Sequence, residues 1–303
     1  MKLQVNNLEK YFGEKKVLNG VSFEAESGKA FGFLGRNGAG KTTTIRIIMD
    51  VFKPNSGEIT IDGEKFNPKK CKVGYLPEER GLYSNELVYD QLFYFSRLKG
   101  AKRKEAKEDI NYWLERFGLM DYRKEKLGTL SKGNQQKVQI IEAILNDPEI
   151  FILDEPFSGL DPVNSMELRK VIKEFIKNDK IVIFSSHQMS YVEEFCEKVA
   201  IIEEGTIVMD GNLKEIKERE AGGKILLNSS NLDVLTLREK LLDTGMVLEA
   251  GLEGDDVILK LRENVDKNQL LQGLLNQNIE ISKFSNFEPS LQDIFVSKVG
   301  VVR

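Results

Sequence analysis

The segment GRNGAGKT, residues 35–42, lies between an apolar run and a helical pattern. Its glycines let backbone amides turn inward around phosphate oxygens, because no Cβ obstructs them, and the N-terminus of the next helix adds its positive end. In such a loop Lys41 brings a charge to the β and γ phosphates, and the Thr42 hydroxyl binds Mg²⁺. We therefore expect a nucleoside triphosphate site with Mg²⁺, contacted by Gly35, Asn37, Gly38, Ala39, Gly40, Lys41, Thr42 and Thr43.

Two adjacent carboxylates, Asp154 and Glu155, end the apolar run EIFILDEP. Open α/β sheets bind ligands at the carboxyl ends of their strands. We expect Asp154 to bind Mg²⁺ through water and Glu155 to act as the general base that polarises the attacking water. An isolated Asp-Glu pair also fits a helix cap or a surface pair, but its place downstream of a phosphate loop favours the catalytic interpretation.

The only histidine, His187, follows a third apolar run, IVIFSS. A lone histidine is usually a surface or core residue. Because this one lies at the same predicted edge of the sheet, we expect it to contact the γ-phosphate and stabilise charge in the transition state.

The elements that position these residues read as an α/β layer fold. Four nearly continuous apolar runs, typical of buried parallel strands, lie at residues 31–34, 150–153, 181–184 and 199–202. Shorter alternating runs near residues 3–5, 21–23 and 58–61 predict an antiparallel edge sheet. Residues 86–146 carry amphipathic helical patterns and no strand pattern, which predicts a helical subdomain. Its charge-rich segment, residues 101–110, alternates Lys and Glu at helical spacing and indicates a solvated helix face more than a binding patch.

A second domain is predicted after a charged stretch that ends in Gly222 and Gly223. We interpret residues 1–215 as the first domain, 216–223 as a linker and 224–303 as the second domain. The second domain reads strand, helix, two strands, helix, strand and a last helix, the split βαβ order of ferredoxin-like α+β modules. Nothing in it is typical of catalysis, so it serves either packing and dimerisation or regulation.

Composition limits the possible partners. A length of 303 residues suits two domains, and a net charge of −4 with both signs interspersed predicts no nucleic-acid partner. Cys71 and Cys196 match no metal or redox spacing, as expected of packing residues in a reduced compartment. The start MKLQVNNLEK lacks a signal-peptide core, and no apolar run approaches the roughly 20 residues that span a bilayer. We expect a cytoplasmic chain that needs a separate protein to act at a membrane.

The segment LSKGNQQK, residues 130–137, opens an amphipathic helix, and Ser131 and Gly133 leave free amides at its N-terminus as a second anion site. It resembles the signature LSGGQ of ATP-binding cassette (ABC) ATPases. The phosphate loop, Asp154 and Glu155, the SGLD of residues 158–161 and His187 occur in the order of that family. The resemblance covers nearly all of residues 1–215 and implies a P-loop NTPase cassette that binds ATP.

In that family two cassettes dimerise head to tail, and each ATP lies between one phosphate loop and the partner's signature helix. The resemblance implies that Ser131, Gly133 and Asn134 bind ATP across the dimer. It assigns Asp161 to communication between the sites and Phe12 to stacking on adenine, although Phe12 can also be a core side chain, with Tyr11 stacking instead.

Three positions depart from the family pattern. Lys132 replaces the first signature glycine, and Asn134 replaces the signature glutamine. Glu78 stands where the family usually has a glutamine that senses Mg²⁺ and the permease. A carboxylate at Glu78 can bind Mg²⁺ and contact the ATP site, but it adds negative charge beside the γ-phosphate.

The resemblance favours an ATP-hydrolysing subunit of a multi-subunit ABC transporter, as a homodimer or heterodimer at the inner face of the cell membrane. The ending FEPSLQDIFVSKVG resembles the extension of cassette ATPases that serve bacterial exporters. We expect the helical subdomain and the loop at residues 79–83 to dock on an integral-membrane permease subunit, which contacts the substrate.

The alternative is a non-transport ABC ATPase that acts on nucleic acid or the ribosome. Such proteins typically carry a long coiled-coil insertion, zinc-binding cysteines or a second cassette, and this sequence has none of these. A P-loop kinase or GTPase fits less well, because the signature segment is present and an NKxD-type sequence is not.

Overall fold

The computed structural model describes residues 1–68, 70–79, 81–157, 160, 162–186 and 188–300, with the backbone alone for residues 162–164. The chain forms two compact units. The first comprises residues 1–213 with the chain end from Lys298, and the second comprises residues 214–297.

A six-stranded sheet forms the centre of the first unit, in the order β10-β9-β3-β8-β7-β6. The four apolar runs predicted as strands are β3 (Ala30–Gly35), β7 (Ile150–Asp154), β8 (Ile181–Ser185) and β9 (Cys196–Glu203). β6 (Val73–Leu76) extends the parallel part, whereas β10 (Thr206–Asn212) pairs antiparallel with β9. Every residue of β3, β7 and β8 is buried, which explains why these strands are apolar without alternation.

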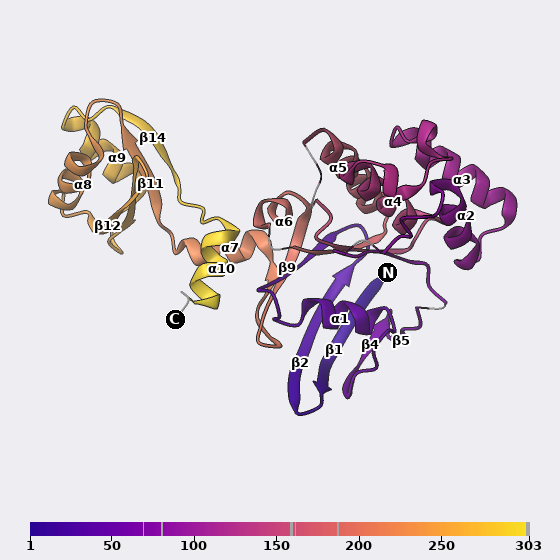
Figure 1. Cartoon of the computed structure of the whole chain (residues 1–303). Coiled ribbons are helices and arrows are strands. Elements are labelled where there is room, and N and C mark those ends of the chain that lie inside the picture. The colour runs from indigo at the N-terminus through magenta and orange to yellow at the C-terminus, as the bar shows by residue number, and fades with distance from the viewer. Residues whose placement is uncertain (69, 80, 158–159, 161, 187, 301–303) are drawn as a thin grey trace. The chain divides into compact units, whose positions relative to one another are not determined.

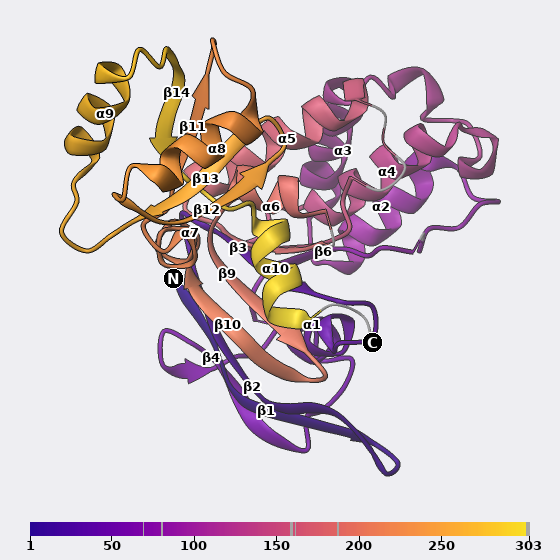
Figure 2. The ribbon, with the colours of Figure 1, turned by 90° about the vertical axis from the view of Figure 1, so that its left-hand side faces the viewer.

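The predicted antiparallel edge is a separate four-stranded sheet, β2-β1-β4-β5, drawn in indigo and purple in Figure 1. Its strands are β1 (Lys2–Phe12), β2 (Lys15–Glu26), β4 (Ser56–Ile61) and β5 (Glu64–Lys65). Inward residues such as Leu3, Val5 and Phe23 join one core with Phe31 and Phe33 of the central sheet. Helix α1 (Lys41–Ile48) adds Ile45, Ile47 and Ile48 to this core, which fixes the helix N-terminus. In Figure 2 the long β1–β2 hairpin is seen at its full length.

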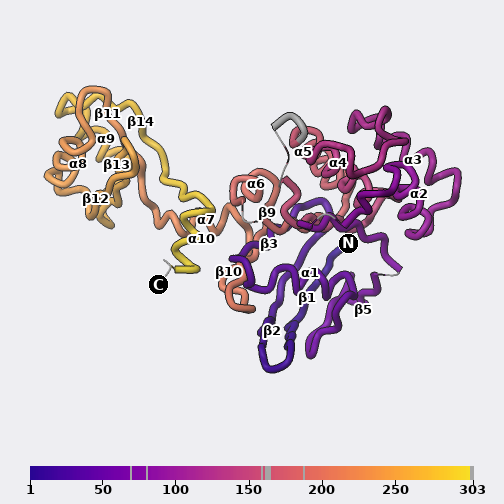
Figure 3. The backbone as a smooth tube through the Cα atoms, viewed as in Figure 1, coloured from indigo at the N-terminus to yellow at the C-terminus, as the bar shows by residue number. Residues whose placement is uncertain are grey.

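The predicted helical subdomain contains α2 (Val88–Leu98), α3 (Arg103–Arg116) and α4 (Lys132–Ile144), with single turns η1 (Met120–Tyr122) and η2 (Leu127–Thr129). Figure 3 traces the backbone from α2 to α4. Helix α3 buries Ala106, Ile110 and Leu114. Its charged residues form exposed pairs such as Lys104–Glu108 at 3.9 Å, as predicted for a solvated face.

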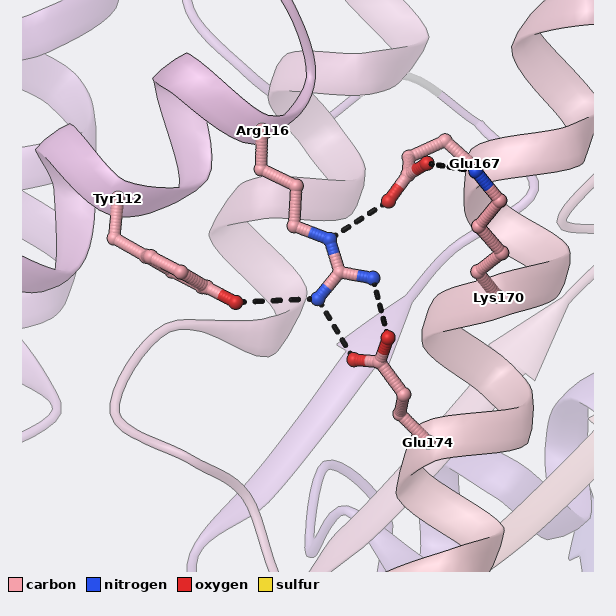
Figure 4. A network of polar contacts seen from close by, with 5 residues as sticks. All are labelled: Tyr112, Arg116, Glu167, Lys170 and Glu174. Atoms are coloured by element: carbon pink, nitrogen blue, oxygen red, sulfur yellow. Dashed lines mark hydrogen bonds and ion pairs between the residues drawn. The ribbon is translucent and has the colours of Figure 1, made fainter.

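Helix α3 is tied to α5 (Pro162–Lys177) by the Arg116 clamp, which consists of Arg116, Glu167 and Glu174 (Figure 4). The Arg116 guanidinium donates two hydrogen bonds of 2.7 Å to the Glu174 carboxylate and one of 2.7 Å to Glu167. Such a fork is among the stronger polar contacts in proteins. The clamp therefore connects the helical subdomain to a helix that flanks the central sheet. Helix α6 (Met189–Phe195) follows β8.

The second unit has the predicted split βαβ order. Its strands pair antiparallel in the order β12-β13-β11-β14. They are β11 (Ile225–Ser229), β12 (Val247–Glu253), β13 (Asp256–Leu261) and β14 (Ile281–Asn286). Helices α8 (Val234–Asp243) and α9 (Lys267–Asn276) share one hydrophobic cluster with β11 and β13 and so cover the same face. Helix α10 (Leu291–Val299) is the predicted last helix.

The stretch predicted as a linker differs from the expectation, because most of it is helix α7 (Leu213–Ala221). Leu213, Ile216 and Ala221 are buried and give the charged sequence an apolar side. The Lys214–Glu218 pair at helical spacing also favours the helix. Gly222 and Gly223, both with positive φ, end it.

Candidate functional site

The glycine-rich loop connects β3 to α1, as its sequence predicts. Gly38 and Gly40 have φ values of 83° and 118°, a region that disfavours side chains. Gly35 is required for another reason: a Cβ there would lie 2.4 Å from the Ile202 carbonyl oxygen of the neighbouring strand β9. Packing and backbone geometry therefore both determine the path of the loop.

The loop lines a cavity of about 220 Å³, which we call the phosphate-loop cavity. Strand β8 lies between β3 and β7, so the carboxyl ends of β3 and β7 open at the same edge of the sheet. The cavity is lined by Asn37, Gly38, Gly40, Lys41, Thr42, Thr43, Glu78, Asp154 and Glu155. The fold thus brings together side chains from three distant parts of the sequence.

Gly35 and Ala39 were predicted to contact the nucleotide but are not among the residues that line the cavity. Both are buried. The Gly35 carbonyl accepts a hydrogen bond from Lys41, and the Ala39 carbonyl accepts one from the Gly205 amide. These two residues therefore support the conformation of the loop through their carbonyl groups and do not line the cavity.

Among the described residues that line the cavity, Lys41 is the one that carries a positive charge. Its Nζ donates to the carbonyl oxygens of Gly35 at 2.7 Å and Arg36 at 3.1 Å. Burial lowers the Lys41 pKa, while the nearby carboxylates of Glu155 and Asp154 oppose that shift. A phosphate oxygen would form a stronger, charge-assisted hydrogen bond with this ammonium group.

Asp154 is the last residue of β7 and Glu155 follows it, and the two are only 4% and 5% exposed. Burial raises the Asp154 pKa, and the negative charges of Glu78 and Glu155 raise it further. The Tyr75 hydroxyl lies 3.5 Å from Asp154 Oδ2. The cavity therefore disfavours the ionised form of Asp154 and would favour a bound cation.

Glu155 has a φ of 51°, which is unusual for a residue with a side chain. Its amide donates to the Ser185 carbonyl at 2.9 Å. The Ser186 hydroxyl donates to Glu155 Oε2 at 2.9 Å and accepts from the Gln188 amide at 3.0 Å. Ser186 thus orients the carboxylate, a role that the sequence analysis missed. The only sequence signal is its position directly after an apolar run and before His187.

Glu78 is exposed and lines the cavity, as the sequence analysis expected. The Gln139 side chain of α4 donates to the carbonyls of Pro77 at 3.1 Å and Glu79 at 3.0 Å. Gln139 therefore links the loop that carries Glu78 to the helix that begins after Ser131. A polar residue in the middle of an amphipathic helix gave no sequence signal for this role.

The Thr42 hydroxyl and the carboxylates of Asp154 and Glu78 fit Mg²⁺, which prefers hard oxygen ligands. Within the described parts of the chain, no group of three or more His, Cys, Asp or Glu side chains forms a metal site by itself. Mg²⁺ in such sites is commonly held by one or two carboxylates together with phosphate oxygens of the substrate.

Ser131, Gly133 and Asn134 lie at the N-terminus of α4. Ser131 is the N-cap, and its hydroxyl accepts from the Asn134 amide at 3.2 Å. Ser131 is exposed, and the other two are partly exposed. None of the three is among the described residues that line the phosphate-loop cavity of the same chain.

Phe12 is 45% exposed, so the alternative that it is a core side chain is wrong. Its ring packs edge-on against the ring of Phe52, with 5.3 Å between the two ring centroids. Stacking of Phe12 on adenine stays a prediction. The roles predicted for Asp161 and His187 fall on residues outside the described parts of the chain.

Among the described residues, no helix combines the length and the apolar character that a membrane span requires.

Two family models match the chain. Residues 18–158 match the model described as ABC transporter. Residues 211–299 match the model for the C-terminal domain of ATP-binding proteins like DrrA1-3. The two matches fall on the cassette and on the region that contains the second unit.

Curated relatives match over almost the whole chain. The ABC transporter ATP-binding protein YhaQ of Bacillus subtilis is 44% identical over 302 residues, which cover 99% of each chain. The bacitracin transport ATP-binding protein BcrA of Bacillus licheniformis is 32% identical, with 98% of this chain and 97% of BcrA covered.

Among solved structures, an ATP-binding subunit of an ABC transporter aligns with a TM-score of 0.68 and 29% identity. The alignment covers 73% of this chain and 93% of that structure. Together with the full-length match to YhaQ, these findings establish that the chain belongs to the ATP-binding subunits of ABC transporters.

Proposed function

We propose that this chain hydrolyses ATP with Mg²⁺ and couples the reaction to a separate membrane permease that exports its substrate. ATP binding and hydrolysis are general in ABC ATPases, and their transporter subunits generally dimerise and pair with permeases. The observation that carries the proposal is the convergence of Lys41, Thr42, Asp154 and Glu155 in one cavity.

In the proposed mechanism the phosphate loop holds the β and γ phosphates and Lys41 balances their charge. Thr42 and Asp154 would hold Mg²⁺, which would neutralise charge that develops on the phosphates. Ser186 orients Glu155. The Glu155 carboxylate then accepts a hydrogen bond from the attacking water and polarises that water. Glu78 contributes a further carboxylate, and Glu78→Gln would change the Mg²⁺ concentration at which activity is half-maximal.

The proposed active form is a dimer of this chain with a second copy or a related chain. The observation behind this proposal is that Ser131 and its neighbours expose the N-terminus of α4 at the surface. Free amides at a helix N-terminus favour anions, so this surface suits the γ-phosphate of an ATP bound to the partner. His187 and Asp161 are proposed to complete the site, with His187 contacting γ-phosphate and Asp161 linking the two sites.

Export is proposed from the relative named for bacitracin transport, 97% of whose sequence is covered, and from the presence of the second unit. The permease would carry the substrate, and the chain would lie at the inner face of the membrane. The second unit is proposed to serve either dimerisation or regulation.

The decisive experiment compares Glu155→Gln with the wild type. Removal of a general base lowers turnover by about 10² to 10⁴, and slow hydrolysis should trap an ATP-bound dimer that is detectable by its solution mass. Glu149→Gln is the matched control, because Glu149 lies just before the opposite end of the same strand and is exposed. Near-normal turnover in Glu155→Gln would contradict the assignment of the base, and a monomeric mass with ATP would contradict the homodimer.

A further inference from the structure

The backbone of Glu155 needs support on both sides of the residue. Its φ of 51° lies in a region that side chains disfavour, and the proline that follows restricts its backbone further. Such a conformation persists only where the surrounding structure holds it. Strand β7 holds the chain before Glu155, because Asp154 pairs with Ser185 of β8. After Glu155, the side chain of Phe157 anchors the chain.

Phe157 is only 5% exposed and stacks on Tyr191 of α6. The two ring centroids are 3.9 Å apart, and the ring planes are inclined by 26°. Phe157 also packs against Phe184 and Phe195, with 6.0 Å between the centroids in each pair. The contact with Tyr191 is therefore the closest of these three ring contacts. Aromatic pairs add stability beyond the area that they bury.

Arg169 of α5 contacts both rings of this stack. Its guanidinium carbon lies 5.1 Å from the Tyr191 ring centroid and 5.8 Å from the Phe157 ring centroid. Both distances are within the range of a cation–π contact. Arg169 also forms an ion pair with Glu194, which lies on the same helix as Tyr191. A third element of the first unit therefore holds the two rings together.

The segment that carries Tyr191 also carries the serine that orients Glu155. The Tyr191 amide donates to the Gln188 carbonyl at 3.2 Å, and the Gln188 amide donates to the Ser186 hydroxyl at 3.0 Å. Ser186 in turn donates to Glu155 Oε2 at 2.9 Å. Phe157 lies two residues after Glu155, so these contacts form a closed ring. The stack and the Ser186 hydrogen bond therefore join the same two segments at two places.

We propose that Tyr191 is a positioning residue for the general base Glu155. Its stack on Phe157 fixes the segment that follows β7 against the segment that follows β8. The Ser186 hydroxyl is thereby kept on the Glu155 carboxylate. The carboxylate then has one orientation before the attacking water binds, and base catalysis depends on such prior alignment. The inference rests on the proposed function, because it concerns the same base.

The first test measures kcat and KM for ATP in the full chain with Tyr191→Ala. We expect kcat to fall about tenfold, well below the loss expected when the base itself is removed. KM should change little, because Tyr191 is not among the described residues that line the phosphate-loop cavity. Tyr191→Phe keeps the ring and should restore kcat. An unchanged kcat in Tyr191→Ala, an equal loss in Tyr191→Phe or a rise in KM alone would overturn the inference.

Tyr112→Ala is the matched control for this test. Tyr112 also contacts an aromatic ring, that of Trp113, and its hydroxyl accepts a hydrogen bond from Arg116. It is not among the described residues that line the phosphate-loop cavity, so kcat should stay unchanged. If Tyr191→Ala does not fold, Tyr191→Leu takes its place, because it removes the flat ring and keeps an apolar side chain.

The second test determines whether Tyr191 acts through Ser186. In a chain that already carries Ser186→Ala, we expect Tyr191→Ala to lower kcat further by less than about twofold, because residues that act as one unit are not additive. Two losses that multiply would show that Tyr191 affects the reaction by another route, and the inference would be wrong.

A crystal structure of Tyr191→Ala tests the inference without reference to activity. The distance from Ser186 Oγ to Glu155 Oε2 is 2.9 Å in the wild type. We expect it to exceed about 3.5 Å in the variant, beyond the range of a hydrogen bond. An intact hydrogen bond would overturn the inference. A wild-type chain without ATPase activity would instead contradict the proposed function, and the crystal structure would still decide whether Tyr191 holds Glu155 in place.

Discussion

The phosphate-loop cavity and the Arg116 clamp both gather charges in partly enclosed surroundings, but they treat those charges in opposite ways. In the clamp, hydrogen bonds to Glu174 raise the Arg116 pKa above its usual range. Burial alone would raise the Glu167 pKa, but hydrogen bonds from Arg116 and Lys170 lower it. The clamp therefore stabilises its charged groups within the folded chain.

In the phosphate-loop cavity the charged forms are disfavoured. Burial lowers the Lys41 pKa and raises the Asp154 pKa, and the ammonium group donates to backbone carbonyls. A ligand that carries phosphates and a divalent cation would offset both costs. The comparison predicts that changes in the cavity affect ATP hydrolysis more than stability, and that changes in the clamp do the reverse.

The largest effect is expected for Lys41→Met. Loss of one preorganised charge at the phosphates should lower the ATPase rate by about 10²–10³, whereas the free energy of unfolding should not fall, because a disfavoured buried charge is removed. ATPase assays and urea denaturation measure the two quantities. Lys53→Met, which removes an exposed lysine just beyond α1, should change neither. A large loss of stability in Lys41→Met would contradict the prediction that changes in the cavity affect ATP hydrolysis more than stability.

Next is Arg116→Met, which leaves two carboxylates without their common partner. The free energy of unfolding should fall by about 1–3 kcal/mol, with the ATPase rate retained well below the unfolding temperature. Urea denaturation measures the loss. For comparison, Lys104→Met breaks an exposed pair and should cost at most about 0.5 kcal/mol. Equal losses in the two variants would show that the clamp behaves as an ordinary surface ion pair.

A smaller effect is expected for Ser186→Ala, which removes the donor that orients Glu155. We expect kcat to fall about tenfold, equivalent to roughly 1.4 kcal/mol, with KM little changed, and Ser186→Thr to restore it. Ser96→Ala is a matched control, because Ser96 is a fully buried serine that donates to Asn146, and neither residue is among those that line the phosphate-loop cavity. If both alanine variants lose kcat equally, Ser186 has only a structural role.

The smallest effect concerns pH. The folded-state pKa of Glu167 lies below its usual value of 4.5, so its contribution to stability is present above that value and is lost as the pH falls through the folded-state pKa. Urea denaturation between pH 3 and 7 should therefore show a weaker acid dependence in Arg116→Met than in the wild type. Identical pH dependence would mean that Arg116 does not hold the Glu167 charge.

The sequence by itself determined most of the fold and the members of the phosphate-loop cavity. Strands β3, β7 and β8 and the middle of β9 are nearly continuous apolar runs because the central sheet buries both of their faces. Glycines, a lysine and a carboxylate pair are the residue types that phosphate and Mg²⁺ chemistry requires, so their spacing predicted the site. The split βαβ order of the second unit was equally readable from its strand and helix patterns.

The sequence patterns missed β6 and β10, which lie at the two edges of the sheet. β6 has only four residues, and β10 ends in Asp, Gly and Asn. The helix in the predicted linker was missed because charged residues and glycines concealed its few buried positions. Periodicity is weak wherever an element buries only part of one face.

Tertiary structure alone decided the contacts that position the site. Ser186 orients Glu155 across 31 residues of sequence, and Gln139 holds the Glu78 loop across about 60. The stack of Phe157 on Tyr191 and the three-way Arg116 clamp are also invisible in sequence. Hydrogen bonds need a donor and an acceptor about 3 Å apart, and only the folded chain determines which distant residues reach that distance.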